Sequence, residues 1–240
     1  MKRTATVAAL ALAGVAALTG CNDQQSSQAA TVPTSASATA LQTQTVKVVK
    51  SVSPAVVQLE CGNSLGSGIV YDDRGDVVTN AHVINGASSC RVMLSDRSKH
   101  SASLVGRDTR HDIAVVRLSG ATPEPATFAN SSDVRVGDTV FAVGNPLGLQ
   151  SSVTQGIVSS LNRNVAESPS VELSALIQTS ADINPGNSGG ALVDLAGRVI
   201  GIPTLTAVDP QLGNSQAPGI GFAIPSDTVK SIASSLIGSS

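Results

Sequence analysis

The sequence predicts an all-β fold of many short strands joined by turns. Hydrophobic residues make up 41% of the 240 residues and aromatic residues only 2%, so the core must be built from Val, Ile, Leu and Ala. Val and Ile favour strands, and 22 Gly with 11 Pro imply many turns. The formal net charge is −2 and there is no long basic run, so no nucleic-acid partner is expected.

The N-terminal residues predict an export signal rather than part of the fold. Two basic residues precede an apolar stretch, residues 7–18, which is shorter than the roughly 20 residues of a membrane span. It leads into Leu-Thr-Gly-Cys, which resembles the lipobox of bacterial lipoproteins. That resemblance implies a signal peptide at 1–20 and an acylated Cys21 that anchors the protein to a membrane of the bacterial envelope. The alternative is an ordinary cleaved signal with a chance cysteine.

The next segment, residues 21–44, predicts a flexible tether, because it is rich in Ser, Ala, Thr and Gln. The globular domain is expected at 45–240. It opens with Val46, Val49 and Val52 at helical spacing, so a short helix is expected before Pro54.

Short strand-like runs then alternate with turns, and residues 121–126, with two prolines, form a link between two halves. The runs before the link are 56–59, 67–71, 77–79, 91–94 and 113–118, and those after it are 139–143, 156–158, 175–178, 191–193, 199–202 and 221–224. Strands at this density indicate a sandwich or barrels. Ser226 is expected to cap a C-terminal helix, whose apolar face is Val229, Ile232, Ala233 and Leu236.

Residues 186–190, Gly-Asn-Ser-Gly-Gly, place Ser188 where a nucleophile is expected. A nucleophilic serine needs a tight, exposed turn with backbone N–H groups directed at a developing oxyanion, and flanking glycines permit that turn. The segment also fits the Gly-x-Ser-x-Gly pattern of α/β-hydrolases. As a five-residue match alone, it is more often a plain glycine-rich turn.

The order of residues along the chain separates these alternatives. An α/β-hydrolase needs its catalytic histidine after the serine, but His82, His100 and His111 all precede Ser188. The subtilisin order needs an aspartate before the histidine, and the candidates there lie in a turn expected to face solvent. The trypsin-like order of His, Asp and Ser is met by His82, Asp112 and Ser188.

The segments around these residues resemble motifs of the HtrA family of serine proteases. They are Thr-Asn-Ala-His-Val at 79–83, Asp-Ile-Ala-Val at 112–115 and Asn-Pro-Gly-Asn-Ser-Gly-Gly at 184–190. Further matches at 66–68, 143–148, 154–158 and 219–225 extend the resemblance over residues 55–229.

The resemblance implies two packed six-stranded antiparallel β-barrels, at about 45–122 and 123–240, with the active site between them. It implies Ser188 as nucleophile, His82 as general base, Asp112 as the orienting carboxylate, and an oxyanion hole at Gly186, Asn187 and Ser188. The expected activity is serine endopeptidase action on unfolded or exposed envelope proteins through an acyl-enzyme. The alternative is a catalytically silent or latent peptide-binding lipoprotein. No cofactor or metal is expected.

The sequence departs from the family at the predicted substrate pocket, assigned to Asp182, Ile183, Gly201 and Ile202. Asp182 stands six positions before Ser188, where trypsin carries the carboxylate that selects Lys or Arg and HtrA relatives carry a small apolar residue. A buried carboxylate without a partner is costly. Two interpretations therefore stay open, a surface aspartate and a pocket for a basic side chain.

Three further expectations concern the rest of the chain. The sequence ends shortly after the family motif, so no PDZ domain is expected. The family resemblance implies a trimer that depends on aromatic residues in an N-terminal arm. Because no aromatic residue precedes Tyr71, the oligomeric state stays open. With Cys21 lipidated, Cys61 and Cys90 remain as a pair for a disulfide, or as two free buried thiols, on either side of the segment that carries His82. Residues 160–175 are expected to form a mobile loop that bears on latency.

Overall fold

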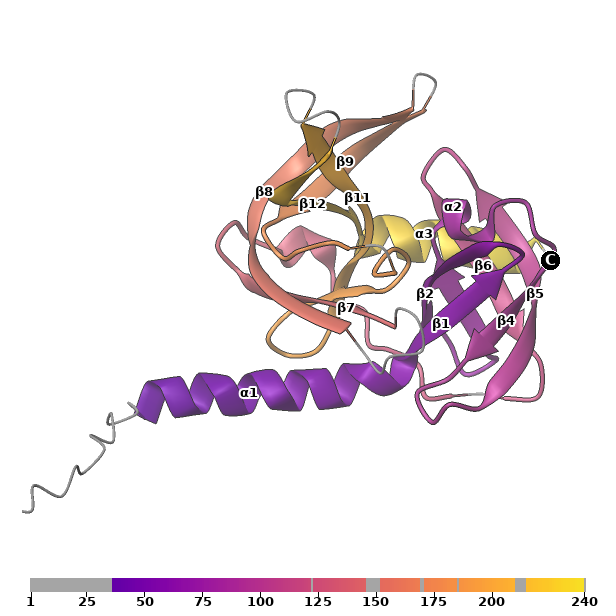
Figure 1. The fold of residues 1–240 in the computed structure, drawn as a ribbon, viewed down its shortest axis with the longest axis horizontal. Coiled ribbons are helices and arrows are strands. Elements are labelled where there is room, and N and C mark those ends of the chain that lie inside the picture. Colours follow the sequence, from indigo (N-terminus) through magenta and orange to yellow (C-terminus); the bar gives the residue numbers. More distant parts are fainter. Residues whose placement is uncertain are drawn as a thin grey trace, which may run out of the picture. The chain divides into compact units, whose positions relative to one another are not determined.

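Two closed antiparallel β-barrels form most of the computed structural model (Figure 1). The structure describes residues 36–121, 123–145, 152–168, 171–184, 186–209 and 215–239. The predicted all-β class with two six-stranded barrels is confirmed. Cys21 lies outside the described residues.

The first barrel closes in the order β1-β2-β3-β6-β5-β4. Its strands are β1 (Val56–Cys61), β2 (Ser64–Val70), β3 (Asp76–Thr79), β4 (Ser89–Met93), β5 (Lys99–Asp108) and β6 (Ile113–Leu118). Because β1 pairs with both β2 and β4, the hydrogen bonds run round the ring without an open edge.

The second barrel repeats this connectivity, in the order β7-β8-β9-β12-β11-β10. Its strands are β7 (Thr139–Gly144), β8 (Ser152–Ser168), β9 (Val171–Thr179), β10 (Ala191–Val193), β11 (Val199–Asp209) and β12 (Ser215–Pro225). The segment expected to be a mobile loop at 160–175 instead belongs to β8 and β9 wherever it is described, because these two strands continue to pair through several register shifts.

Alternation along a strand explains the apolar run of β6. Ala114 and Val116 enter a core cluster inside the first barrel, whereas Ile113 and Val115 enter a second cluster that also contains residues of the second barrel, such as Phe141. Successive side chains of a strand point to opposite faces. A strand that is buried on both faces is therefore apolar throughout, and the barrels share a core where they meet.

Helix α1 (Ala36–Val52) extends further than predicted. The sequence favoured a flexible tether up to residue 44, but the described helix starts eight residues earlier and contains neither Gly nor Pro to interrupt it. Its last turns bury Val48 and Val52, and the side chain of Gln44 donates to the Leu195 C=O at 2.7 Å. Packing of this apolar stripe and the tie from Gln44 stabilise a segment whose composition alone favours disorder.

Helix α3 (Ser226–Gly238) is the predicted C-terminal helix, with a different start. Ser226 was expected to cap the helix through its side chain, but its hydroxyl donates to the Ala129 C=O at 2.9 Å instead. The helix contacts β5 and β6 as well as β11 and β12, so it spans both barrels. None of the helices in the described part of the chain is long and apolar enough to cross a membrane.

The link between the barrels is irregular where it is described. Ala126 N–H donates to the Val70 C=O at 2.9 Å, and Tyr71 meets Phe128 edge to face at 5.4 Å between ring centroids. These contacts hold the chain against the first barrel as it passes to the second. Three short helical turns complete the described elements, η1 (Ser53–Ala55), α2 (Ala81–Ile84) and η2 (Ser131–Asp133).

Candidate active site

Ser188 lies in a turn between β9 and β10, which we call the serine turn (residues 186–190). Gly186 has φ 101° and Gly189 has φ 79°, a conformation that L side chains rarely adopt. Space is also restricted, since a Cβ on Gly189 would lie 2.2 Å from the Ser67 oxygen and 2.3 Å from the Thr79 hydroxyl. Glycine is therefore required on both sides of Ser188.

The backbone hydrogen bonds of the serine turn leave two of its N–H groups without an acceptor among the described residues. Asn187 donates its N–H to the Asn184 C=O, and its C=O accepts the Gly190 N–H, both at 2.9 Å. Because a trans peptide directs its C=O and N–H to opposite sides, the Ser188 N–H is turned outward. Within the described residues, the N–H groups of Gly186 and Ser188 have no acceptor. Such a pair can bind an oxyanion.

His82 is held by both oxygens of one buried carboxylate. Its Nδ1 lies 2.9 Å from Asp112 Oδ2, and its backbone N–H donates to Asp112 Oδ1 at 3.0 Å. The His82 side chain is 39% exposed, whereas that of Asp112 is 2% exposed. The imidazole is therefore partly exposed, and its Nδ1 is fixed by a carboxylate in the interior.

Asp112 is itself fixed from two sides in a strained backbone conformation. Its φ is 53°, uncommon for a residue with a side chain. The Asn80 side chain donates to its C=O at 3.0 Å, and the Thr204 hydroxyl donates to its Oδ2. Sequence reasoning did not identify Thr204, which follows an apolar run in β11. No local pattern marks its hydroxyl, because the contact is formed between the barrels.

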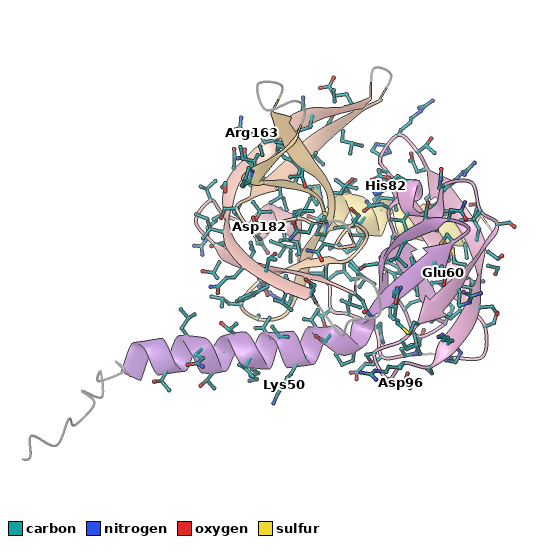
Figure 2. The ribbon with its side chains drawn as sticks, in the orientation of Figure 1. Lys50, Glu60, His82, Asp96, Arg163 and Asp182 are labelled. Carbon is teal, nitrogen blue, oxygen red and sulfur yellow. A yellow bond between two sulfur atoms is a disulfide. The ribbon has the colours of Figure 1, made fainter. Side chains whose placement is uncertain are left out.

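Hydrogen bonds join the serine turn to the elements that hold Asp112. The N–H of Ser67 in β2 donates to the Ser188 C=O at 2.9 Å. The Gly189 N–H donates to the Pro203 C=O at 3.1 Å, and the residue after Pro203 is the threonine that contacts Asp112. These hydrogen bonds link the turn of Ser188, in the second barrel, to the elements that hold Asp112 and through it His82, which Figure 2 shows on the first barrel.

A family model for the trypsin-like peptidase domain matches residues 66–202. This is more than half of the 240-residue chain. The chain belongs to the trypsin-like peptidase domain family. Its HtrA-like motifs agree with the similar proteins described next.

Three curated proteins resemble the chain over most of its length. Protease Do-like 1, chloroplastic, of Arabidopsis thaliana is 43% identical over 182 residues, 75% of this chain and 40% of that protein. Periplasmic serine endoprotease DegP of Escherichia coli K12 is 47% identical over 72% of this chain and 36% of its own length. Serine protease Do-like HtrA of Bacillus subtilis is 43% identical over 72% and 39%.

A solved structure is similar as well. That of HtrA-type protease AlgW with tripeptide has a TM-score of 0.71 and 40% identity, and the match covers 80% of this chain and 63% of the other. The chain spans only 36–40% of the length of the curated relatives described above. The likeness therefore concerns the peptidase domain.

The four residues predicted for the substrate pocket lie in two segments, with Asp182 and Ile183 after β9 and Gly201 and Ile202 in β11. Ile183 contacts Gly221, where a Cβ would lie 2.4 Å from Ile183 Cγ1, and its C=O accepts the Thr206 hydroxyl at 2.9 Å. Thr206 and Gly221 are register partners in β11 and β12. Gly201 and Ile202 lie further back in β11, where Ile202 is fully buried in the core. The assignment of these residues to a substrate pocket stays a prediction.

Asp182 is exposed, and its backbone rather than its carboxylate makes the described contacts. Its C=O accepts the Thr154 hydroxyl at 2.7 Å and the Asn187 side-chain amide at 3.4 Å. The carboxylate therefore has access to water and needs no buried cation as a partner.

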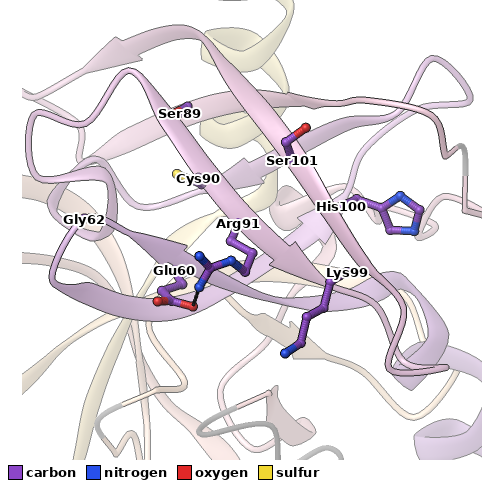
Figure 3. Close-up of a pocket in the computed structure, with 8 residues that line it drawn as sticks. All are labelled: Glu60, Gly62, Ser89, Cys90, Arg91, Lys99, His100 and Ser101. Atoms are coloured by element: carbon purple, nitrogen blue, oxygen red, sulfur yellow. Dashed lines mark hydrogen bonds and ion pairs between the residues drawn. The ribbon is translucent and has the colours of Figure 1, made fainter.

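The predicted disulfide joins Cys61 in β1 to Cys90 in β4. These residues continue the pairing of the two strands, whose last register pair is Glu60 with Arg91. The bridge encloses β2, β3 and the His82 helix in one covalent loop. Beside it, an open hollow of about 530 Å³ is lined partly by Arg91, Lys99 and His100 (Figure 3). None of its lining residues belongs to the site around Ser188.

The other two histidines make their described side-chain contacts outside the serine turn. His111 is 54% exposed, and its Nδ1 lies 2.8 Å from Asp108 Oδ2. Burial alone would raise the pKa of the Asp108 carboxyl, but hydrogen bonds from His111 and from backbone N–H groups lower it. His100 is half-buried beside Ser98.

Proposed function

We propose that this chain is a serine endopeptidase in which Ser188, His82 and Asp112 act as a catalytic triad. The observation that carries the proposal is the pair of hydrogen bonds between Asp112 and His82, at 2.9 and 3.0 Å. The serine turn is hydrogen-bonded to β11, the strand whose Thr204 contacts Asp112. Fold, residue order and family membership agree with it.

In the first half of the reaction, Ser188 Oγ attacks the peptide carbonyl carbon while His82 Nε2 takes its proton. The resulting oxyanion is stabilised by the N–H groups of Gly186 and Ser188, each contributing about 2.7–4 kcal/mol. Collapse of the tetrahedral intermediate breaks the C–N bond, and His82 gives the proton to the leaving amine. An acyl ester on Ser188 remains.

In the second half, water takes the place of the amine. His82 accepts a proton from the water as it attacks the acyl carbon, and returns that proton to Ser188 Oγ when the ester bond breaks. Asp112 accepts a hydrogen bond from Nδ1 throughout, which fixes the tautomer with Nε2 as the basic nitrogen and stabilises the imidazolium.

For the substrate, we propose peptide segments that bear a small aliphatic residue before the cleaved bond. Ile183 packs closely against Gly221, so the wall that they would give a substrate pocket is apolar. Asp182 is exposed and solvated, so nothing in its surroundings demands a substrate cation. Unfolded or exposed proteins present such segments in extended form.

For location, we propose export to the bacterial envelope and a lipid anchor on Cys21. The proposal rests on the apolar stretch and Leu-Thr-Gly-Cys motif. The curated relative from Escherichia coli is named periplasmic, which agrees with export.

The test is digestion of a complex peptide library with the full-length chain, with cleavage sites read by mass spectrometry and Ser188→Ala as control. Cuts that need Ser188 and follow small aliphatic residues are expected. A library left intact by the wild type, or cut equally by Ser188→Ala, would contradict the proposed activity.

A further inference from the structure

Ser67, in β2, forms hydrogen bonds to the serine turn through two of its three polar groups, the N–H and the hydroxyl. Its N–H donates to the Ser188 C=O at 2.9 Å. Its hydroxyl donates to the Gly186 C=O and accepts the Asn145 N–H at 2.8 Å. The Ser67 C=O accepts the Thr79 hydroxyl at 2.7 Å, and the residue is fully buried. Ser67 thus holds the carbonyls of the two residues whose N–H groups form the candidate oxyanion hole.

The serine turn does not fix the Gly186 carbonyl by itself. Glycine adopts positive and negative φ about equally, so the orientation of Gly186 at φ 101° depends on contacts from outside. The backbone of β7 packs close by, since a Cβ on Gly144 would lie 3.0 Å from the Gly186 oxygen. In the described part of the chain, however, the Ser67 hydroxyl is the one donor to that oxygen.

Burial and a hydrogen bond to a carbonyl do not by themselves distinguish Ser67. Ser226 is also fully buried, and its hydroxyl donates to the Ala129 C=O at 2.9 Å. What differs is the carbonyl that is held, because Ala129 lies before η2 and outside the serine turn. Ser226 is therefore a matched control for the loss of a buried hydroxyl.

We infer that Ser67 is a positioning residue that orients the oxyanion-binding N–H groups of the serine turn through the carbonyls of Gly186 and Ser188. The inference rests on the proposed peptidase function and adds to it a residue outside the triad. Ser67 belongs to the first barrel, whereas the N–H groups that it orients belong to the serine turn of the second barrel.

Substitution should affect the chemical step more than substrate binding. Ser67→Ala removes the donor to Gly186 but retains the backbone tie to Ser188. Complete loss of an oxyanion donor lowers kcat by about 10²–10³-fold, so a misoriented donor should lower it by roughly 10- to 100-fold. KM should stay within about twofold, because interactions made only in the transition state affect kcat.

The experiment compares full-length wild type, Ser67→Ala and Ser226→Ala by peptide kinetics and by amide hydrogen exchange. Both variants should lose similar amounts of thermal stability. Only Ser67→Ala should show the fall in kcat and faster exchange at the N–H groups of Asn187, Gly189 and Gly190, which are hydrogen-bonded in the wild type. Ser67→Cys keeps a single γ atom, although sulfur is larger than oxygen, and donates only weakly, so its kcat should be intermediate, and it decides the question if Ser67→Ala does not fold.

Equal kcat and amide exchange rates in Ser67→Ala and Ser226→Ala would overturn the role of Ser67, and so would a rise in KM at unchanged kcat. The proposed function would stand in both cases, provided that the wild type cleaves peptide. A wild type that neither cleaves peptide nor reacts at Ser188 with a fluorophosphonate would overturn the proposed function, and the role of Ser67 in catalysis with it.

Discussion

Asp112 is the residue that concentrates the constraints of the site. Its carboxylate is nearly fully buried, contacts His82 twice and accepts the Thr204 hydroxyl. The hydrogen bond that the Asn80 side-chain amide donates to its C=O holds the backbone at this positive φ. Residue order along the chain, together with the short family motifs around them, was sufficient to select Asp112 and His82 as candidates. Thr204 could not be selected, because its role arises from packing between segments 92 residues apart.

Thr204→Val tests the support of Asp112. Valine keeps the shape of threonine but removes the donor to Oδ2, so the carboxylate loses a charge-assisted hydrogen bond of about 1.5 kcal/mol. We expect kcat/KM to fall roughly tenfold, measured with a peptide substrate. The control is Thr179→Val, which removes another fully buried hydroxyl that bonds the Ile157 C=O. An equal fall in both variants would argue against a specific role.

Asp182→Ala tests the substrate pocket. Because the carboxylate is exposed, we expect the residue preferred before the cleaved bond to stay small and aliphatic, with kcat/KM within about twofold of wild type. Cleavage profiling of a peptide library gives the answer. A wild-type preference for Lys or Arg that disappears in the variant would show that Asp182 selects basic residues.

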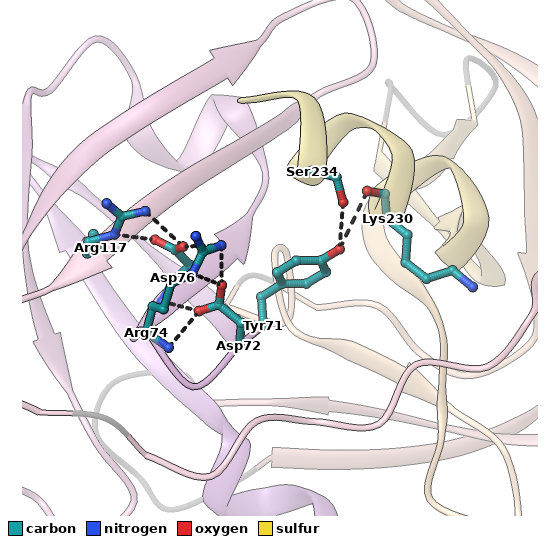
Figure 4. Close-up of polar contacts among 7 residues, drawn as sticks. All are labelled: Tyr71, Asp72, Arg74, Asp76, Arg117, Lys230 and Ser234. Atoms are coloured by element: carbon teal, nitrogen blue, oxygen red, sulfur yellow. Dashed lines mark hydrogen bonds and ion pairs between the residues drawn. The ribbon is translucent and has the colours of Figure 1, made fainter. Parts of the chain in front are cut away.

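At the scale of elements, the turn from β2 to β3 shows how a polar cluster stabilises the first barrel (Figure 4). Asp76 is fully buried, and Arg117 of β6 binds its two oxygens at 2.7 and 2.9 Å. Hydrogen bonding to Asp76 raises the pKa of the Arg117 guanidinium. Arg74 lies 3.5 Å from Asp76 and pairs with Asp72. Cross-strand ion pairing thus replaces apolar packing at one end of the barrel.

Arg117→Leu should destabilise the protein by about 2 kcal/mol. The value lies below the roughly 3–5 kcal/mol of a fully buried pair because Arg117 is 39% exposed and Arg74 remains near Asp76. Urea unfolding measures the change. Adding Asp76→Asn should recover part of the loss, since the uncompensated charge is removed. If the double variant loses more free energy of unfolding than the two single variants lose when their effects are added, this explanation is contradicted.

The elements differ in how far the sequence predicted them. Most of the strands and the C-terminal helix were predicted because the apolar spacing of each follows its own secondary structure, whereas β5, with few buried residues, was missed. Helix α1 was predicted too short, since its stability depends on Val48 and Val52 packing and on the tie from Gln44 to Leu195. The parts of β8 and β9 that lie within residues 160–175 were taken for a loop because register shifts interrupt their alternation.

At the scale of the whole molecule, the site depends on the meeting of two barrels. Core residues of both barrels form one cluster, and α3 contacts strands of each. Tyr71 of the first barrel reaches Ser234 of α3 at 3.2 Å. The prediction that the site lies at this junction came from the family resemblance, whereas the neighbours of Ile183 depend on the register of β11 with β12, which no local sequence pattern gives.

Cys21→Ser tests the proposed anchor. Without a thiol to acylate, the exported chain should move from the membrane fraction to the soluble fraction while keeping its peptidase activity, because a diacyl anchor needs the cysteine. Fractionation and immunoblotting measure the change. A variant that stays with the membrane would contradict lipidation at Cys21.

The most direct test of the triad is the rate at which a fluorophosphonate labels Ser188, measured by intact mass and peptide mapping. We expect a single adduct on Ser188 of the wild type, with labelling slowed by roughly 10³–10⁴-fold in His82→Ala and Asp112→Asn, because the nucleophile then lacks its oriented base. Labelling at another residue, or rates in these variants equal to the wild type, would contradict the assignment of Ser188, His82 and Asp112 as the catalytic triad.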